Sequence, residues 1–161
     1  MQLYLLRHGE AEIAAASDPV RKLTAKGHSD IKSVARQFAS LGLVIDQCLC
    51  SPYARARETA HTFLQSLDAD LAIEETPLLT PDTRASAVMD LLSGLPDTCR
   101  VLLVGHNPLM SELQALLTEG SIAQMHILDA GELIVISINI IGLGMGTRTG
   151  KLLPGTSPQL D

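Results

Sequence analysis

The stretch QLYLLRHG at residues 2–9 and the stretch VLLVGHNP at residues 101–108 are built in the same way. In each, a run of apolar residues leads directly into a histidine that stands beside a glycine. A continuous apolar run is typical of a strand buried on both faces, as in a parallel sheet covered by helices. His8 and His106 therefore each follow the carboxyl end of a buried strand. That edge is where open α/β sheets bind their ligands.

Strand and helix signals alternate along the rest of the chain. Further strands are predicted at residues 45–50, 71–74, 132–140 and 151–153, the last of them after a turn at 142–150. Helices are predicted to open at Thr24, Ser51-Pro52, Thr80-Pro81 and Asn107-Pro108, and to end near residues 41, 67, 92 and 117. This alternation predicts an α/β fold, a three-layer αβα sandwich with a mostly parallel central sheet.

The length and composition of the chain fit one domain. The chain has 161 residues, and its composition does not shift in a way that suggests a second domain. Apolar residues make up 46% of it but aromatic residues only 2%, so aliphatic side chains must build the core. We expect a single domain over residues 1–161, with a loose tail at 154–161 because Leu160 is the only core-type residue there.

Charge and cysteine content exclude several classes of function. The net charge of −6 argues against a nucleic-acid surface, and the longest late apolar run, residues 133–145, is shorter than the roughly 20 residues of a membrane span. Cys48, Cys50 and Cys99 cannot by themselves form a four-ligand zinc site or a closed set of disulfides. We therefore expect free thiols, no metal and no cofactor. No signal peptide is visible, so we expect a cytoplasmic protein. We also expect a monomer.

Cationic groups are predicted to gather around the two histidines. The helix that opens at Asn107-Pro108 directly follows His106, and the N–H groups of a helix amino terminus favour an anion. Arg55 falls in the first turn of another helix that starts beyond a strand end, and a guanidinium suits bidentate phosphate binding. Arg7 stands next to His8. The sequence thus indicates an anion site at this edge of the sheet.

These motifs, taken together, resemble a known family. RHG at residues 7–9, SPYARARET at 51–59 and GH at 105–106 are similar to the histidine phosphatase (phosphoglycerate-mutase-like) superfamily. RHGEA at 7–11, ASD at 16–18, Arg21 and LTAKG at 23–27 resemble its shorter branch, the SixA-type phosphohistidine phosphatases. The resemblance covers nearly the whole chain and weakens after about Gly120.

The resemblance implies a mechanism. The first histidine of the family attacks phosphorus and becomes phosphorylated, which assigns the role of nucleophile to His8. The groups implied to bind the phosphoryl oxygens are Arg7, Arg55 and His106, with Asn107 and Arg21 as further candidates. The arginines supply the charge that a metal supplies elsewhere. To share one phosphate, the two imidazole rings must lie within about 8 Å of each other.

Two departures from the family favour one class of substrate. Mutase-like relatives carry a glutamate general acid in a longer segment after the third strand, and the corresponding short stretch here, residues 75–81, has no obvious equivalent. Acid-phosphatase relatives carry His-Asp where this chain has His106-Asn107. A missing proton donor costs ester hydrolysis a factor of about 10² to 10⁴, whereas imidazole is a good leaving group. Short connections also leave no lid. The expected substrate is therefore a protein-borne phosphohistidine on a phosphotransfer domain or carrier.

Two other functions remain open. One is a broad phosphomonoesterase for sugar or nucleotide phosphates, and the other is a catalytically idle module that binds phosphate or phosphohistidine. The intact set of Arg7, His8, Arg55 and His106 argues against an idle module. One carboxylate of the loop at residues 10–22 could also serve as a partial general acid, the candidates being Glu10, Glu12 and Asp18.

Overall fold

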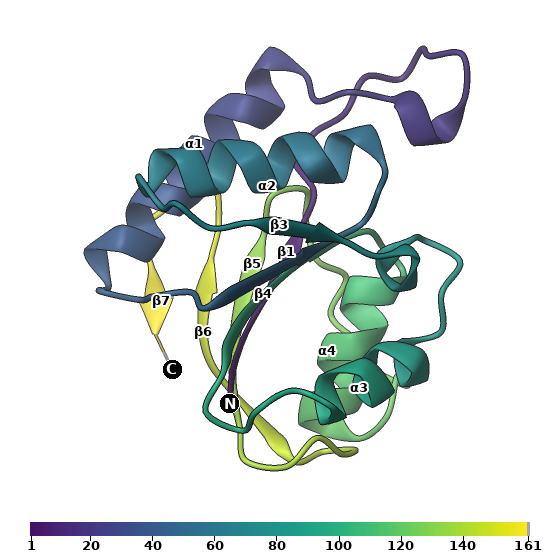
Figure 1. Ribbon diagram of the computed structural model, residues 1–161, viewed down its shortest axis with the longest axis vertical. Helices are drawn as coiled ribbons and strands as arrows, with labels where there is room; N and C mark the ends of the chain where they lie inside the picture. The colour runs from purple at the N-terminus through teal and green to yellow at the C-terminus, as the bar shows by residue number, and fades with distance from the viewer. Residues whose placement is uncertain (161) are drawn as a thin grey trace.

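A seven-stranded sheet lies at the centre of the computed structural model, which describes residues 1–160 (Figure 1). Its strands are β1 (Gln2–Arg7), β2 (Gln47–Cys50), β3 (Ile73–Glu75), β4 (Arg100–Gly105), β5 (Leu133–Ile138), β6 (Gly146–Leu152) and β7 (Gln159–Leu160). They are ordered β3-β2-β4-β1-β5-β6-β7. β1 to β4 are mutually parallel, whereas β5, β6 and β7 each pair antiparallel. Five of the seven strands therefore run in one direction, and the prediction of a mostly parallel sheet is confirmed.

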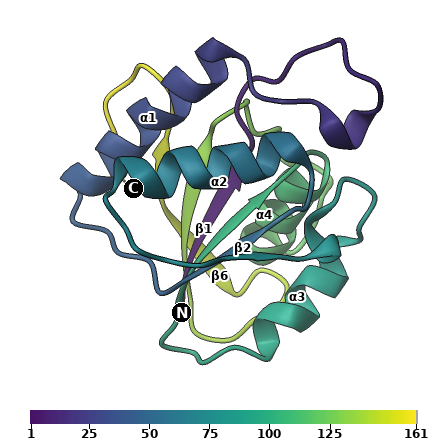
Figure 2. The same cartoon turned by 45° about the horizontal axis from the view of Figure 1, so that its top comes forward.

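Helices cover both faces of this sheet. α1 (Ala25–Ser40) and α2 (Ala54–Ser66) pack on one face, and α3 (Ala85–Ser93) and α4 (Leu109–Glu119) on the other (Figures 1 and 2). Alternate residues of β1 point to opposite faces: Leu3 and Leu5 join one core, and Tyr4 and Leu6 the other. The predicted three-layer α/β fold is confirmed. No helix within residues 1–160 is both long enough and apolar enough to cross a membrane.

The predicted start of α1 is confirmed, because its cap is local. Thr24 has extended backbone angles, and its Oγ1 accepts a hydrogen bond from the N–H of Gly27 at 2.9 Å. Such a cap satisfies one of the N–H groups that a helix start leaves without a partner. Residue and partner lie three positions apart, so the sequence alone contains the information.

Three other predicted helix starts are wrong. α2 begins at Ala54 rather than at Pro52, α3 at Ala85 rather than at Pro81, and α4 at Leu109 rather than at Pro108. In each case the expected capping side chain has other partners. The hydroxyl of Thr80, for example, donates to the carbonyl of Pro77 at 2.8 Å and so closes the preceding short helix η2 (Pro77–Leu79).

The carboxyl-terminal segment is more ordered than its side chains predict. β6 begins at Gly146, five residues before the predicted strand, and pairs with β5. The expectation of a loose tail is wrong for Gln159 and Leu160, which pair with Lys151 and Gly150. Strand pairing uses backbone groups, so a segment poor in core residues can still join a sheet edge. Asp161, the last residue of the expected tail, lies outside the described residues.

Candidate active site

The two histidines meet because their strands are neighbours in register. Arg7 of β1 pairs with Gly105 of β4, so His8 and His106 leave the sheet at the same level. The backbone N–H of His8 also donates to the carbonyl of Gly105 at 3.0 Å. The two ring centroids lie 4.9 Å apart, within the distance expected for residues that share one phosphate.

The geometry of His8 leaves a lone pair on Nε2. Its Nδ1 lies 2.7 Å from the carbonyl oxygen of Gly9, and because a carbonyl can only accept, Nδ1 carries the proton. Nε2 accepts a bond from Nε of Arg55 at 3.2 Å. Burial is the main cause that lowers the pKa of His8 to about 4, and the nearby arginines add to it against the opposing effect of the Gly9 carbonyl. At neutral pH the ring is therefore uncharged and able to act as a nucleophile.

His106 is more deeply buried and also neutral. Only 1% of the residue is exposed, and its Nε2 lies 2.8 Å from Oγ of Ser51. Burial, followed by the charges of His8 and Arg55, lowers the pKa of His106 to about 3. Its Nδ1 is buried without a hydrogen-bond partner. A single neutral N–H can still bind an anion, provided that the proton is on the nitrogen that faces it.

These buried neutral rings predict a loss of stability in mild acid. In the unfolded chain, His8 and His106 bind protons below about pH 6.5. In the folded protein they do so only near their lowered pKa values. The free energy of unfolding therefore falls as the pH falls below 6.5. Between pH 6.5 and pH 5 we expect each ring to lower the free energy of unfolding by up to about 1.4 kcal/mol per pH unit. Urea unfolding at half-unit steps measures this slope. His106→Gln should flatten it, and an identical slope in the variant would contradict the assignment.

Arg55 connects the histidines to the loop before α1. The residue is 4% exposed, and its guanidinium donates to the backbone carbonyl of Asp18 at 2.7 Å and to the Asp18 carboxylate at 2.9 Å. Hydrogen bonds from Arg55, assisted by Arg21, lower the pKa of the Asp18 carboxyl. Asp18 is therefore ionised at neutral pH. In this arrangement it accepts hydrogen bonds and is a poor proton donor.

Arg7 is held by the segment between α4 and β5. One terminal nitrogen donates to the carbonyl of Leu128 at 2.6 Å, while Nε is buried without a partner. The side-chain amide of Asn107 donates to the same carbonyl at 2.9 Å, and its oxygen accepts from Ser111 at 2.8 Å. The Asn107 side chain thus fixes this segment instead of capping α4. Arg21 lies at the loop, bonded to Asp18 and to the carbonyl of Glu12.

The other two carboxylates of the loop are placed differently from Asp18. Glu10 accepts a hydrogen bond from the hydroxyl of Thr24 at 2.8 Å, at the start of α1. The backbone carbonyl of Glu12 accepts a hydrogen bond from Nε of Arg21 at 2.6 Å. Of the three candidate acids, Asp18 is therefore the one that contacts Arg55.

The sequence analysis did not identify Glu132, a residue with a buried carboxylate that lies directly before β5 and contacts the backbone of Arg7 through its own backbone. This carboxylate is fully buried and bonds to His126 at 2.7 Å, while Lys151 lies at 3.1 Å and the N–H of Asp129 at 2.7 Å. The backbone carbonyl of Glu132 accepts the N–H of Arg7 at 3.1 Å. The one signal in the sequence was a charged residue at the start of the apolar run 132–138, since buried carboxylates are rare without partners.

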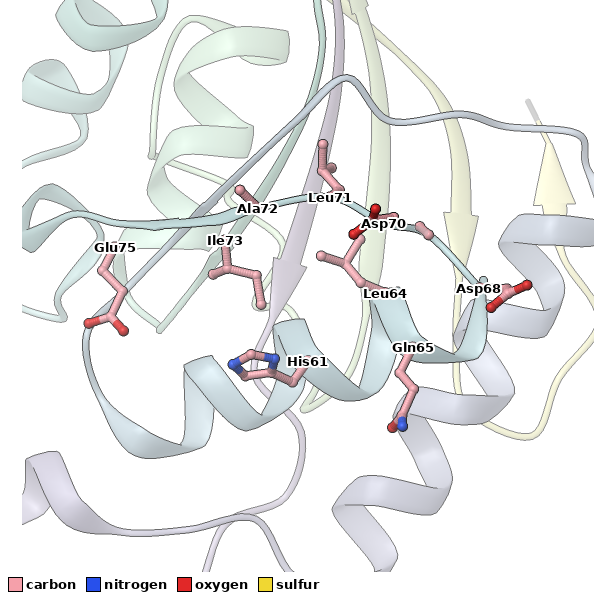
Figure 3. A pocket seen from close by; sticks show the side chains of 10 residues that line it. His61, Leu64, Gln65, Asp68, Asp70, Leu71, Ala72, Ile73 and Glu75 are labelled. Carbon is pink, nitrogen blue, oxygen red and sulfur yellow. The ribbon is translucent and has the colours of Figure 1, made fainter.

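The described part of the chain holds no cluster of metal ligands, and its groove along α2 is separate from the two histidines. Within residues 1–160, no three His, Cys, Asp or Glu side chains are placed to hold a metal ion. A groove of about 730 Å³ runs along α2 and the segment leading into β3 (Figure 3). Its lining includes His61, Gln65, Asp68 and Glu75. It includes none of the four central site residues, Arg7, His8, Arg55 and His106. Carboxylates on this groove make it unsuitable for a phosphate.

Comparison with known proteins agrees with the fold and the motifs. Residues 3–81 match the family model of the histidine phosphatase superfamily (branch 1). The chain is 31% identical to phosphohistidine phosphatase SixA of Escherichia coli (strain K12), over 96% of this chain and 94% of that protein. It is 37% identical to a SixA homolog of Haemophilus influenzae, over 71% of this chain and 76% of that protein.

A solved structure of a SixA protein has the same fold as this chain. The structure of the protein histidine phosphatase SixA complexed with tungstate superimposes with a TM-score of 0.87 and 29% identity, covering 96% of this chain and 97% of that one. The chain therefore belongs to the histidine phosphatase superfamily, in the branch of the SixA proteins.

Proposed function

We propose that this protein is a metal-independent phosphohistidine phosphatase that acts on a phosphohistidine-bearing protein, such as a phosphotransfer domain or carrier. The observation that carries the proposal is the neutral His8, whose Nε2 lone pair faces Arg55 while His106 lies 4.9 Å away. Two relatives that match most of the chain are named for this activity.

The reaction proceeds in two displacements. Nε2 of His8 attacks phosphorus, the bond from phosphorus to the substrate imidazole breaks, and the electron pair leaves with that imidazole. Water then cleaves the new phosphorus–nitrogen bond on His8 and releases phosphate. Arg55, which donates to the Nε2 lone pair in the free protein, must redirect its N–H groups to the phosphoryl oxygens as the new bond forms.

The positive groups near His8 suit the transferring phosphoryl group. Arg55 donates to His8, the ring of His106 lies beside it, and the charge of Arg7 helps to lower its pKa. These three groups would bind the equatorial oxygens, where negative charge concentrates. Asn107 and Arg21 share their partners with these arginines: Asn107 donates to the carbonyl of Leu128, as Arg7 does, and Arg21 donates to the carboxylate of Asp18, as Arg55 does. The leaving imidazole departs as a neutral group when its far nitrogen is protonated. The ionised Asp18 is therefore not needed as an acid.

A comparison of substrates tests this function. We expect kcat/KM for a phosphohistidine protein to exceed that for sugar and nucleotide phosphates by at least about a hundredfold, the lower end of what a general acid contributes to ester hydrolysis. The assays are run at one pH, on the same protein preparation. A sugar or nucleotide phosphate turned over equally well would establish the phosphomonoesterase instead. Binding of phosphate without turnover of any substrate would indicate an idle module.

Chelation and oxyanions test the metal-free mechanism. Activity should persist in excess EDTA, because the arginines supply the positive charge, and tungstate or vanadate should inhibit by occupying the phosphoryl site. A SixA protein of the same fold has been solved with tungstate. Activity lost on chelation and restored by Mg²⁺ or Zn²⁺ would contradict this mechanism.

We also propose that the enzyme works as a monomer in the cytoplasm. All four central site residues come from one chain, so a second copy is not needed to complete the site. Cys48, Cys50 and Cys99 are free, which suits a reducing compartment. Sedimentation analysis of the active protein tests the first point, and fractionation of cells the second.

A further inference from the structure

Ser51 is buried between the ends of two strands and contacts His106. It is 0% exposed and directly follows β2, where its N–H donates to the carbonyl of Val104 in β4 at 3.0 Å. Its Oγ accepts a bond from the N–H of Tyr53 at 3.3 Å and lies 2.8 Å from Nε2 of His106. The register of β2 and β4 therefore places this hydroxyl beside the second histidine of the site.

The hydrogen-bond pattern around Ser51 favours one of the two neutral tautomers of His106. Because the Tyr53 N–H already donates to the serine oxygen, the hydroxyl proton is available for an acceptor, and Nε2 of His106 is the acceptor at hand. With Nε2 as acceptor, a neutral His106 carries its single proton on Nδ1. With the opposite tautomer, the hydroxyl proton of Ser51 would have no acceptor among the hydrogen bonds of residues 1–160.

Nδ1 of His106 then becomes a buried donor that lacks an acceptor. Four buried side-chain polar atoms have no partner within residues 1–160: two glutamine oxygens, and two nitrogens that both belong to this site, Nε of Arg7 and Nδ1 of His106. A buried donor without an acceptor costs free energy, and such a cost is typically found where a ligand completes the bond. A phosphoryl group brings the oxygens that these two nitrogens lack.

We propose that Ser51 is a positioning residue that holds His106 as the Nδ1–H tautomer, so that Nδ1 donates to a phosphoryl oxygen. The second half of this proposal rests on the proposed function, whereas the first half concerns the free protein. Ser51 acts through His106 and does not itself contact the reacting atoms. The serine that local sequence rules assign to a helix cap thus serves the chemistry of a strand-end histidine 55 residues away.

The tautomer can be measured in the complete protein by ¹⁵N–¹H long-range NMR of the histidine rings at neutral pH. We expect His106 to be the Nδ1–H form in the wild type and in Ser51→Thr, which keeps a hydroxyl. In Ser51→Ala we expect a shift towards the Nε2–H form. Wild-type His106 in the Nε2–H form, or an unchanged tautomer in Ser51→Ala, would overturn the proposal.

Activity and oxyanion binding test the second half of the proposal, that Nδ1 of His106 donates to a phosphoryl oxygen. Ser51→Ala should lower kcat/KM and tungstate affinity about tenfold, with recovery in Ser51→Thr, while Ser66→Ala on α2 should leave both unchanged. Tungstate should move the Nδ1–H signal of His106, and the lack of any such movement would refute the donor role. If Ser51→Ala fails to fold, the wild-type tautomer and its response to tungstate decide the matter. A wild type without turnover but with the expected tautomer would contradict the proposed function and support only the first half of the proposal, that Ser51 fixes the tautomer of His106.

Discussion

His8→Ala should lower turnover of a phosphohistidine protein by at least about 10³-fold and abolish the phosphoenzyme. The reason is that Nε2 of His8 carries the lone pair that attacks phosphorus in the proposed mechanism. The buried thiols do not replace it: burial raises the pKa of Cys48 to about 12 and that of Cys50 as well, so neither forms a thiolate at neutral pH. Single-turnover assays with labelled substrate measure both effects.

A histidine outside the site supplies the control. His61 is exposed on α2, and His61→Ala should keep full activity. Rapid quench of the wild type should trap label that is acid-labile and base-stable, as a phosphorus–nitrogen bond requires, and peptide mapping should place it on His8. Label on Ser, Cys or His106, or full turnover by His8→Ala, would show that the nucleophile is wrongly assigned.

Arg55→Ala should lower kcat by about 10² to 10³-fold, the usual cost of removing one preorganised donor from a developing negative charge. Arg55→Lys should recover only part of this loss, because an ammonium cannot bind two phosphoryl oxygens in the planar geometry of a guanidinium. Arg55 is suited to the role because it is buried beside His8 and lies over the ring of Tyr53 at 5.1 Å.

The neighbouring arginine on the same helix is the matched control. Arg57 is about half exposed and pairs with Glu75 at 3.5 Å, away from His8, so Arg57→Ala should keep kcat. Urea midpoints of both variants separate lost chemistry from lost folding, since Arg55 also holds Asp18. Unchanged kcat in Arg55→Ala, or equal losses in both alanine variants, would remove Arg55 from the proposed mechanism.

Features that depend on neighbouring residues were predictable from the sequence. The continuous apolar runs of β1 and β4 predict buried parallel strands, and the structure buries Leu3 to Leu6 and Val101 to Val104. The Thr24 cap of α1 involves a partner three residues away. Two histidines that follow two such strands could be expected to meet, because parallel neighbours end at the same edge. The fold class follows from these local patterns, and so does the expectation that His8 and His106 lie at one edge of the sheet.

Hydrogen-bond partners far apart in the chain were decided by the tertiary structure alone. Ser51 and Asn107 are both good capping residues, but the fold brings His106 to one and the carbonyl of Leu128 to the other, and these bonds replace the caps. Asp18 meets Arg55 across 37 positions. A polar side chain has several possible partners of similar energy, so the partner that it binds depends on which one packing brings within about 3 Å. The sequence by itself therefore determined the layers of the fold and which residues are expected to form the site. Only the folded chain decided which partners hold each of those side chains, because packing brings together residues that are far apart in the sequence.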